Sequence, residues 1–241
     1  MAFCTGIPVF KVIATDVDGT LTLRRGDVRL SPYALKGVRE AERAGVSVII
    51  VSGNSLPVTV GLRTYLGASG PAVAENGCLV FYREEVFHVC RSDVPKELIE
   101  KVKGLGLIET WQNPYRRHDI AFYVHKGRGS AESIINEVSE LASSYGVRVL
   151  WSGYALHLNT GTGKAAGVLK AIELLGAKKE ELAAIGDGEN DLDMLAVAAL
   201  SGAPSDAADQ VRRAVNYVAP RPGGAGFLDF VREVLKRNPK P

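Results

Sequence analysis

The chain has 241 residues, of which 46% are apolar and 23% charged, a composition typical of a soluble globular protein. Its formal net charge of +2 provides no basic face for nucleic acid, so we expect no nucleic-acid partner. No apolar run approaches the roughly 18 residues that span a membrane, and the N-terminus lacks the pattern of a signal peptide, so we expect no membrane partner. The three cysteines, Cys4, Cys78 and Cys90, lack metal-ligand spacing and predict reduced thiols in a cytoplasmic protein.

The first part of the chain predicts a strand, a helix and a second strand. Apolar runs at residues 9–16 and 46–51 predict buried strands. Between them, Ser31 and Pro32 supply an N-cap and a first-turn proline, and Gly45 ends the helix. Because such a crossover makes the strands parallel, their carboxyl ends meet at one edge of the sheet, where open α/β sheets bind ligands.

The middle of the chain has a different pattern, which predicts a small α+β insert with its own sheet. Before it, we expect a helix at 56–66, a strand at 72–74, a turn at Glu75-Asn76-Gly77 and a return strand at 78–82. The insert itself predicts helices at 94–105 and 130–145 and strands at 119–125, 147–151 and 154–159.

The last third returns to the parallel pattern. It predicts helices at 164–175, 190–197, 205–214 and 226–236, the third capped by Ser205-Asp206, and strands at 182–186, 198–201 and 215–218. The fold class is therefore α/β: a doubly wound, Rossmann-like parallel-sheet core of residues 1–83 and 160–241, with an inserted α+β cap domain of residues 84–159.

Polar residues follow several of these strands. Asp16 and Asp18 come directly after the first strand, and bringing two like charges within about 4 Å costs on the order of 4 kcal/mol at an effective dielectric of 20. A polar turn explains an isolated Asp-x-Asp-Gly equally well. However, Ser52-Gly53-Asn54, Lys164 and the segment 187–191 are expected at the same edge. Carboxylates of this kind suit Mg²⁺, and a lysine neutralises a phosphoryl group, so the set predicts phosphoryl transfer through an aspartate nucleophile. The residues alone do not decide between Asp16 and Asp18 as that nucleophile.

Two glycine-rich segments resemble nucleotide-binding motifs but fail at defining positions. In Gly161-Thr162-Gly163-Lys164, the first glycine of a P-loop would fall at Leu158, and Ala165 replaces the metal-binding hydroxyl. After Gly186-Asp187-Gly188, Asp191 stands where a dinucleotide fingerprint has its third glycine. The sequence therefore contains neither a P-loop nor a dinucleotide-binding fingerprint at these positions.

The four polar segments together resemble the four motifs of the haloacid dehalogenase superfamily of phosphatases, and the insert resembles the α/β (C2-type) cap of its sugar-phosphatase-like branch. Glu75-Asn76-Gly77 also matches a turn of that branch, whereas Gly202-Ala203 departs from its usual Asn-Ala. The resemblance implies that Asp16 is the nucleophile and Asp18 the general acid and base. It implies substrate binding by Ser52, Gly53, Lys164 and Asn190, and Mg²⁺ binding by Asp16, Asp18 (through its carbonyl), Asp187 and Asp191, the last as a ligand or as a neighbour of the ligands.

The function implied is hydrolysis of a small phosphorylated metabolite through an aspartyl phosphate, with 2-phosphoglycolate the favoured substrate. A sugar-phosphate phosphatase or a phosphomannomutase-like phosphotransferase is the alternative, and a non-catalytic phosphate- or metal-binding module a distant one. A homodimer is compatible with the sequence, which does not determine the oligomeric state.

Two polar segments of the insert are each compatible with two roles. Arg116, Arg117 and His118 precede the strand at 119–125, where an arginine offers a two-pronged donor to a substrate carboxylate. A solvated basic turn explains them equally well. His157 lies on the polar face of its strand, which faces either the cleft or solvent.

Overall fold

The computed structural model describes residues 9–124 and 131–238. Cys4, the N-terminal residues judged against a signal peptide, and the predicted ends of one strand and one helix at 125 and 130 lie outside the described residues. No helix in the described ranges is both long and apolar enough to cross a membrane.

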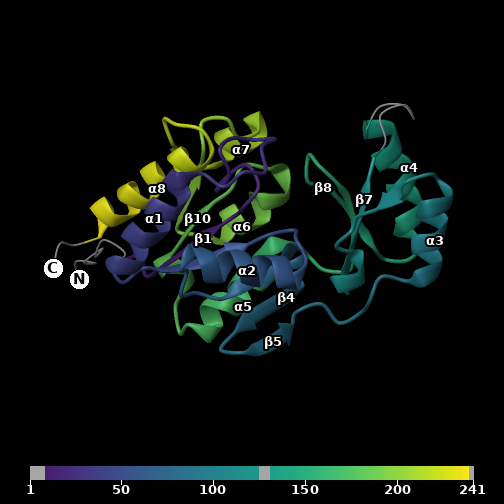
Figure 1. Ribbon diagram of the computed structural model, residues 1–241, viewed down its shortest axis with the longest axis horizontal. Helices are drawn as coiled ribbons and strands as arrows, with labels where there is room; N and C mark the ends of the chain where they lie inside the picture. Colours follow the sequence, from purple (N-terminus) through teal and green to yellow (C-terminus); the bar gives the residue numbers. More distant parts are fainter. Residues whose placement is uncertain (1–8, 125–130, 239–241) are drawn as a thin grey trace, which may run out of the picture.

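An eight-stranded sheet forms the core of the fold, in the order β12-β11-β10-β1-β2-β3-β4-β5 (Figure 1). The six strands from β12 to β3 are parallel, and β4 and β5 add an antiparallel edge. The strands are β1 (Val12–Thr15), β2 (Ser47–Val51), β3 (Ala72–Ala74), β4 (Leu79–Tyr82), β5 (Glu85–His88), β10 (Leu182–Ile185), β11 (Leu200–Ala203) and β12 (Tyr217–Val218).

Helices cover both faces of this sheet, which explains why its strands are continuous apolar runs. On one face, α1 (Pro32–Arg43), α2 (Leu56–Leu66) and α8 (Gly223–Arg237) pack on side chains such as Ile13 and Ile50. On the other, α5 (Lys164–Leu174), α6 (Leu192–Val197) and α7 (Asp209–Ala214) pack on Val12 and Ile49. The predicted doubly wound α/β core is confirmed.

The insert has its own four-stranded antiparallel sheet, in the order β6-β7-β9-β8, and stands beside the core in Figure 1. Its strands are β6 (Ile108–Glu109), β7 (Asp119–Tyr123), β8 (Arg148–Trp151) and β9 (Leu156–Asn159). Helices α3 (Lys96–Gly104) and α4 (Ala131–Ser143) cover one face, where Leu98, Val138, Phe122 and Leu158 form a separate core. The alternate residues of β7 and β9 therefore face away from the helices.

Three predictions about this region and its neighbours were wrong. The strand β5, which falls in the range 84–159 assigned to the insert, pairs with β4 in the core sheet. This hairpin brings Cys78 and Cys90 together, and they form a disulfide instead of remaining reduced. The helix predicted from Ser205-Asp206 begins at Asp209, because the Asp206 carboxylate instead accepts hydrogen bonds from the distant backbone N–H groups of Arg25 and Gly223, at 2.8 and 3.0 Å.

Candidate active site

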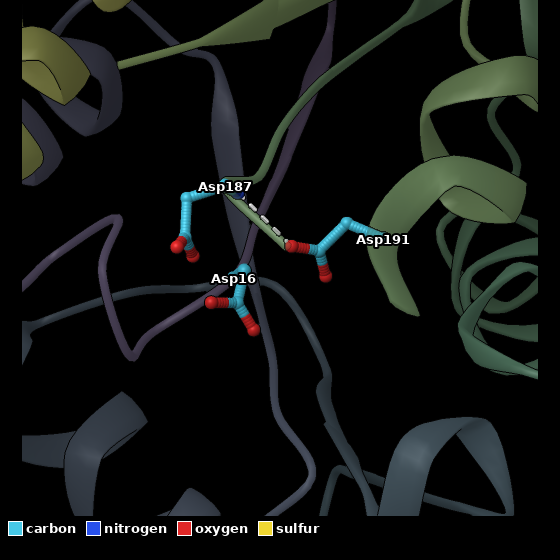
Figure 2. Close-up of side chains that lie close together, drawn as sticks. All are labelled: Asp16, Asp187 and Asp191. Atoms are coloured by element: carbon cyan, nitrogen blue, oxygen red, sulfur yellow. Dashed lines mark hydrogen bonds between the residues drawn. The ribbon is translucent and has the colours of Figure 1, made fainter. Parts of the chain in front are cut away.

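Two acidic segments about 170 residues apart in sequence meet at the carboxyl edge of the sheet. Strands β1 and β10 are parallel neighbours, with Thr15 opposite Ile185, so Asp16 and Asp187 leave the sheet side by side. The Asp16 N–H donates to the Ile185 carbonyl at 3.0 Å. Asp191 follows from the short 3₁₀ turn Glu189–Asp191, and the three carboxylates converge in Figure 2, with one oxygen of each within 4.8 Å of the others.

Lys164 is the cation that bridges this cluster. It is the first residue of α5, only 1% exposed, and its Nζ lies 2.5 Å from both Asp16 Oδ1 and Asp191 Oδ1. The other Asp191 oxygen accepts hydrogen bonds from the N–H groups of Asp187 and Gly188, at 3.0 and 2.9 Å. Both oxygens of Asp191 thus accept hydrogen bonds, whereas Asp16 keeps one oxygen free of any ion pair in the described structure.

The pKa values in the cluster are shifted mainly by burial, and its three carboxylates outnumber the one lysine that bridges them. Burial and then the Asp191 charge raise the pKa of Asp16 well above its usual range, against the effect of Lys164. The same two causes raise the pKa of Asp187 to about 7, although Arg25 Nε lies 3.3 Å from its carboxylate. Burial lowers the pKa of Lys164, but Asp16 and Asp191 outweigh it and hold the pKa above its ordinary value. Converging carboxylate oxygens with this unbalanced charge fit a divalent cation.

Asp18 has a separate environment from the carboxylate cluster. Its side chain lines a cavity, and its Oδ2 accepts a hydrogen bond from Asn54 Nδ2 at 3.1 Å. Although water reaches it there, the surrounding protein disfavours its charge and raises the pKa of Asp18. A raised pKa suits a group that must carry a proton at one stage of a reaction and release it at another. The cluster's ligand atoms come from Asp16, Asp187 and Asp191, so the contact of the Asp18 carbonyl with a metal stays a prediction.

Gly19 allows the turn after β1 to lie close to Asp187, which follows β10. Its φ of +88° lies in the left-handed region, and a Cβ there would stand 2.3 Å from Asp187 Oδ2. Its N–H donates to Thr22 Oγ1 at 2.8 Å, which holds the turn. A glycine at this position is therefore a requirement of the site's geometry.

The predicted substrate-binding residues lie around the same edge. Ser52 follows β2, is fully buried, and accepts hydrogen bonds at Oγ from the Asn54 N–H and Nδ2 at 3.0 and 2.9 Å. Gly53, Lys164 and Asn190 line the cavity together with Asn54, whereas Ser52 is not among the lining residues. Their binding of substrate stays a prediction.

The cavity has a volume of about 660 Å³ and lies between the core and the insert. Its floor contains Asp16, Asp18 and Asp187, and its roof consists of residues from the insert. Within the described chain, the roof residues are Thr110, Trp111, Gln112, Arg116, Ala121, Tyr123, Ser152, Gly153, Tyr154, Ala155 and His157. Most of these were not predicted as site residues, because nothing in a segment such as 110–112 marks it as functional before the insert's sheet is folded over the core.

A family model described as haloacid dehalogenase-like hydrolase matches residues 13–127 and 113–230 of this chain. The chain belongs to this family. Proteins named phosphoglycolate phosphatase are similar to it: one from Aeropyrum pernix is 44% identical over 93% of each chain. Another, from Metallosphaera sedula, is 42% identical over 94% of this chain and 100% of its own.

Solved structures share the fold of this chain. The crystal structure of Thermoplasma acidophilum 0175 has a TM-score of 0.84 and 27% identity, and covers 94% of this chain and 99% of its own. A haloacid dehalogenase-like hydrolase from Bacteroides thetaiotaomicron, at 20% identity and a TM-score of 0.76, shares the fold over 93% of this chain and 99% of its own. The departure at Gly202 in this hydrolase has a local cause, because a Cβ there would stand 2.4 Å from the Phe230 ring.

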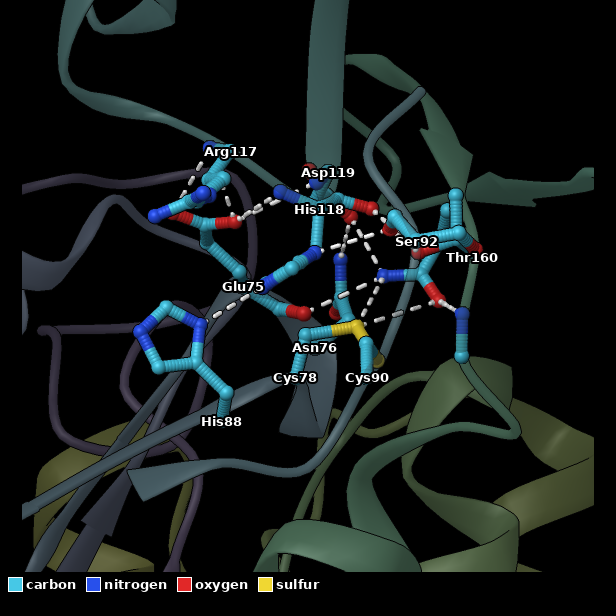
Figure 3. The surroundings of a disulfide bond; sticks show 12 residues. Glu75, Asn76, Cys78, His88, Cys90, Ser92, Arg117, His118, Asp119 and Thr160 are labelled. Atoms are coloured by element: carbon cyan, nitrogen blue, oxygen red, sulfur yellow. Dashed lines mark hydrogen bonds between the residues drawn. A yellow bond between two sulfur atoms is a disulfide. The ribbon is translucent and has the colours of Figure 1, made fainter. Parts of the chain in front are cut away.

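The junction between core and insert of this hydrolase is held by the turn Glu75–Gly77 and the disulfide (Figure 3). The Glu75 carboxylate accepts hydrogen bonds from the backbone N–H groups of Arg117, His118 and Asp119, at 2.8 to 3.2 Å. Burial raises the pKa of Glu75, although these donors oppose the effect. The turn therefore fixes the start of β7, which directly follows Arg116, Arg117 and His118.

The three basic residues before β7 have three different environments. The Arg117 side chain is 61% exposed and pairs with Asp93. His118 is buried beside His88, with their ring nitrogens 2.9 Å apart, and does not line the cavity. Arg116 faces the cavity, as does His157 on the neighbouring strand β9. The interpretation as a simple solvated turn therefore fails for Arg116.

Proposed function

We propose that this hydrolase is a Mg²⁺-dependent phosphomonoesterase that acts on a small organic phosphate, with 2-phosphoglycolate as the substrate. Relatives that are 32 to 44% identical over nearly the whole chain carry the name phosphoglycolate phosphatase, which supports both the reaction and the substrate. The cavity of about 660 Å³ fits a small molecule between the acidic floor and the roof.

The observation that carries the proposal is the pairing of Lys164 with Asp16 beside two further buried carboxylates. In the proposed reaction, an Asp16 oxygen attacks phosphorus, and the bond to the ester oxygen breaks to leave an aspartyl phosphate. Asp18, whose raised pKa favours a retained proton, donates that proton to the departing alkoxide. It then accepts a proton from the water that hydrolyses the aspartyl phosphate, which regenerates Asp16.

Lys164 and the cation stabilise the negative charge in this reaction. Lys164 stabilises charge on both Asp16 and the phosphoryl oxygens, since its ammonium group is buried and remains protonated. Asp16, Asp187 and Asp191 would hold Mg²⁺, which supplies positive charge against the phosphoryl group and keeps Asp16 ionised.

The substitution Asp16→Asn tests the mechanism. We expect phosphate release to fall by at least about 10³-fold with the fold retained, because an amide is no nucleophile for phosphorus. Release of inorganic phosphate is measured with 2-phosphoglycolate and Mg²⁺, and Asp93→Asn, at an exposed carboxylate of the insert, is the matched control. Turnover by Asp16→Asn at the rate of the control contradicts the mechanism. Conversion of a sugar phosphate to its isomer without phosphate release indicates a phosphotransferase instead.

A further inference from the structure

We infer that Arg116 and His157 bind a carboxylate of the substrate, so that the roof of the cavity selects phosphate esters that also carry an acidic group. The inference rests on the proposed phosphomonoesterase function and adds the residues that choose among its substrates.

Arg116 presents an unused bidentate edge. Its side chain is 3% exposed, and Nη1 donates to both the Gly53 carbonyl and Asp119 Oδ1, each at 2.8 Å. Nε is buried without a hydrogen-bond partner, and in the described chain Nη2 has none either. A buried, orphaned guanidinium nitrogen is rare in a folded protein and indicates a missing acceptor.

The free pair of nitrogens has the geometry that a carboxylate fits. Elsewhere in this chain, Arg29 uses Nε and Nη2 to bind the two oxygens of Asp27, at 3.1 and 2.7 Å. Arg221 binds Asp229 with the same edge, at 2.8 and 2.6 Å. Arg116 offers this edge beside the cavity, with its other edge already fixed by protein acceptors.

His157 is a second cavity-lining residue, and Asp119 orients it as it does Arg116. Its Nδ1 lies 2.7 Å from Asp119 Oδ1, so Nδ1 carries a hydrogen and Nε2 is the free nitrogen of the ring. The residue lines the cavity, and no described residue bonds to Nε2. Nε2 is therefore the ring nitrogen of His157 that is left to contact a bound substrate.

Asp119 positions both groups without facing the ligand. It is fully buried, and Oδ2 also accepts hydrogen bonds from Asn76 Nδ2 and Asn159 Nδ2, each at 2.9 Å. Burial opposes its ionisation, but His157, Arg116 and Asn76 outweigh burial and lower the pKa of Asp119 to about 2. Its single negative charge is thus shared between a guanidinium and an imidazole.

The charge on the two sides of the cavity differs in sign. The lining carboxylates, those of Asp16, Asp18, Asp27 and Asp187, all belong to the core, and they outnumber the two cations of the core that line the cavity, Arg25 and Lys164. The described residues of the insert that line the cavity include no acidic side chain, and Arg116 is the charged residue among them. An anion is therefore favoured at the roof and disfavoured at the floor unless a cation accompanies it.

Arg116 also lies close enough to the phosphoryl end for a short substrate. It binds the carbonyl of Gly53, which adjoins Ser52, and the next residue, Asn54, donates to Asp18. Arg116 is thus bonded directly to the segment 52–54, which is predicted to bind the phosphoryl group. This contact suits a short molecule in which one carbon atom carries both the carboxylate and the phosphate ester, as in 2-phosphoglycolate.

The test compares two esters that differ only at the acidic end: 2-phosphoglycolate and 2-hydroxyethyl phosphate. We expect Arg116→Met to lower the ratio of kcat/KM for the acidic ester over the neutral one by about 30-fold or more, as the loss of a buried charged hydrogen bond does. Arg116→Lys keeps the charge without the fork and should lose about tenfold. His157→Asn keeps a donor toward Asp119 but lacks Nε2, and should also lower the ratio. Arg117→Met, the exposed neighbour, is the control and should leave the ratio unchanged.

A second measurement separates this inference from the proposed function. Calorimetric titration of Asp16→Asn with each ester reports binding without turnover, and adding Arg116→Met should remove the preference for the acidic ester. The inference is overturned if Arg116→Met lowers kcat/KM equally for both esters, or if the preference for the acidic ester is unchanged in both assays. Should the wild type hydrolyse neither ester, the proposed function fails, and the titration still decides the carboxylate site. If Arg116→Met does not fold, the lysine variant decides.

Discussion

Asp119 is the residue whose replacement tests the charge network of the roof most directly. It is fully buried, and four donors from four residues converge on its two oxygens. Asp119→Asn preserves the size of the side chain but removes its charge. It also turns an amide NH₂ group toward residues that are themselves donors, so at least one buried donor loses its acceptor.

The magnitude follows from the pKa of this group. The pKa of Asp119 falls from its ordinary value of 3.8 to about 2, which at about 1.4 kcal/mol for each pH unit corresponds to about 2 kcal/mol of stability in the ionised state. With the unpaired donor, we expect Asp119→Asn to lower the free energy of unfolding by about 3 kcal/mol at pH 7. Because the folded pKa is depressed, this stabilisation is present above about pH 4 and is lost as the pH falls toward 2.

Equilibrium unfolding in urea at pH 7, 5 and 3 measures this difference. The wild type and Asp119→Asn should differ by about 3 kcal/mol at pH 7 and 5, and by clearly less at pH 3. Asp93→Asn, at an exposed carboxylate of the same domain, should change the free energy of unfolding by less than about 0.5 kcal/mol. Equal stability of Asp119→Asn and wild type at pH 7, or a difference that does not depend on pH, refutes the reasoning.

Three further predictions concern the floor of the cavity and the junction. Gly19→Ala places a Cβ 2.3 Å from Asp187 Oδ2 at a φ of +88°, so it should lower the free energy of unfolding by more than about 2 kcal/mol. The control Gly45→Ala, at a φ of +77° with open space around it, should lower it by only about 1 kcal/mol. Equal losses of the two variants in urea unfolding contradict the steric argument. Because the pKa of Asp187 is about 7 without a metal, calorimetry should show Mg²⁺ affinity rising by up to about tenfold per pH unit below 7 and levelling off above it; a flat profile from pH 5.5 to 8.5 speaks against it. Reduction of the Cys78–Cys90 disulfide, whose cysteines are 12 positions apart in sequence, should lower the free energy of unfolding by about 3 kcal/mol in the chain-entropy model. Unchanged stability in dithiothreitol excludes this contribution.

The core was predictable because its signals are local and repeated. Each parallel strand is an apolar run, and the first helix has a recognisable start at Ser31 and Pro32, where the Ser31 hydroxyl accepts from the Tyr33 N–H at 3.2 Å. The strand β5 was missed because it has only four residues and half of them, Glu85 and His88, are polar. Its pairing with β4 also decides the disulfide, so one missed strand produced two wrong predictions.

The carboxyl-edge residues were predictable for a geometric reason. Parallel neighbours bring their ends to one edge, so Asp16 and Asp187 had to meet once their strands were adjacent. The distribution of protons was not predictable, because the pKa of each carboxylate depends on burial and on the distance to Lys164 and Arg25.

The amino-acid sequence by itself determined the architecture of the core, the residues at its carboxyl edge and their chemistry, since these depend on strand order and on motifs a few residues long. Only the tertiary structure decided what lies opposite them. Arg116, Asp119 and His157 come from two strands of the insert, and their meaning depends on contacts with Gly53 and Asn76 in the core. Such contacts are set by how two separately packed sheets fit together, and no local pattern in the chain encodes that fit.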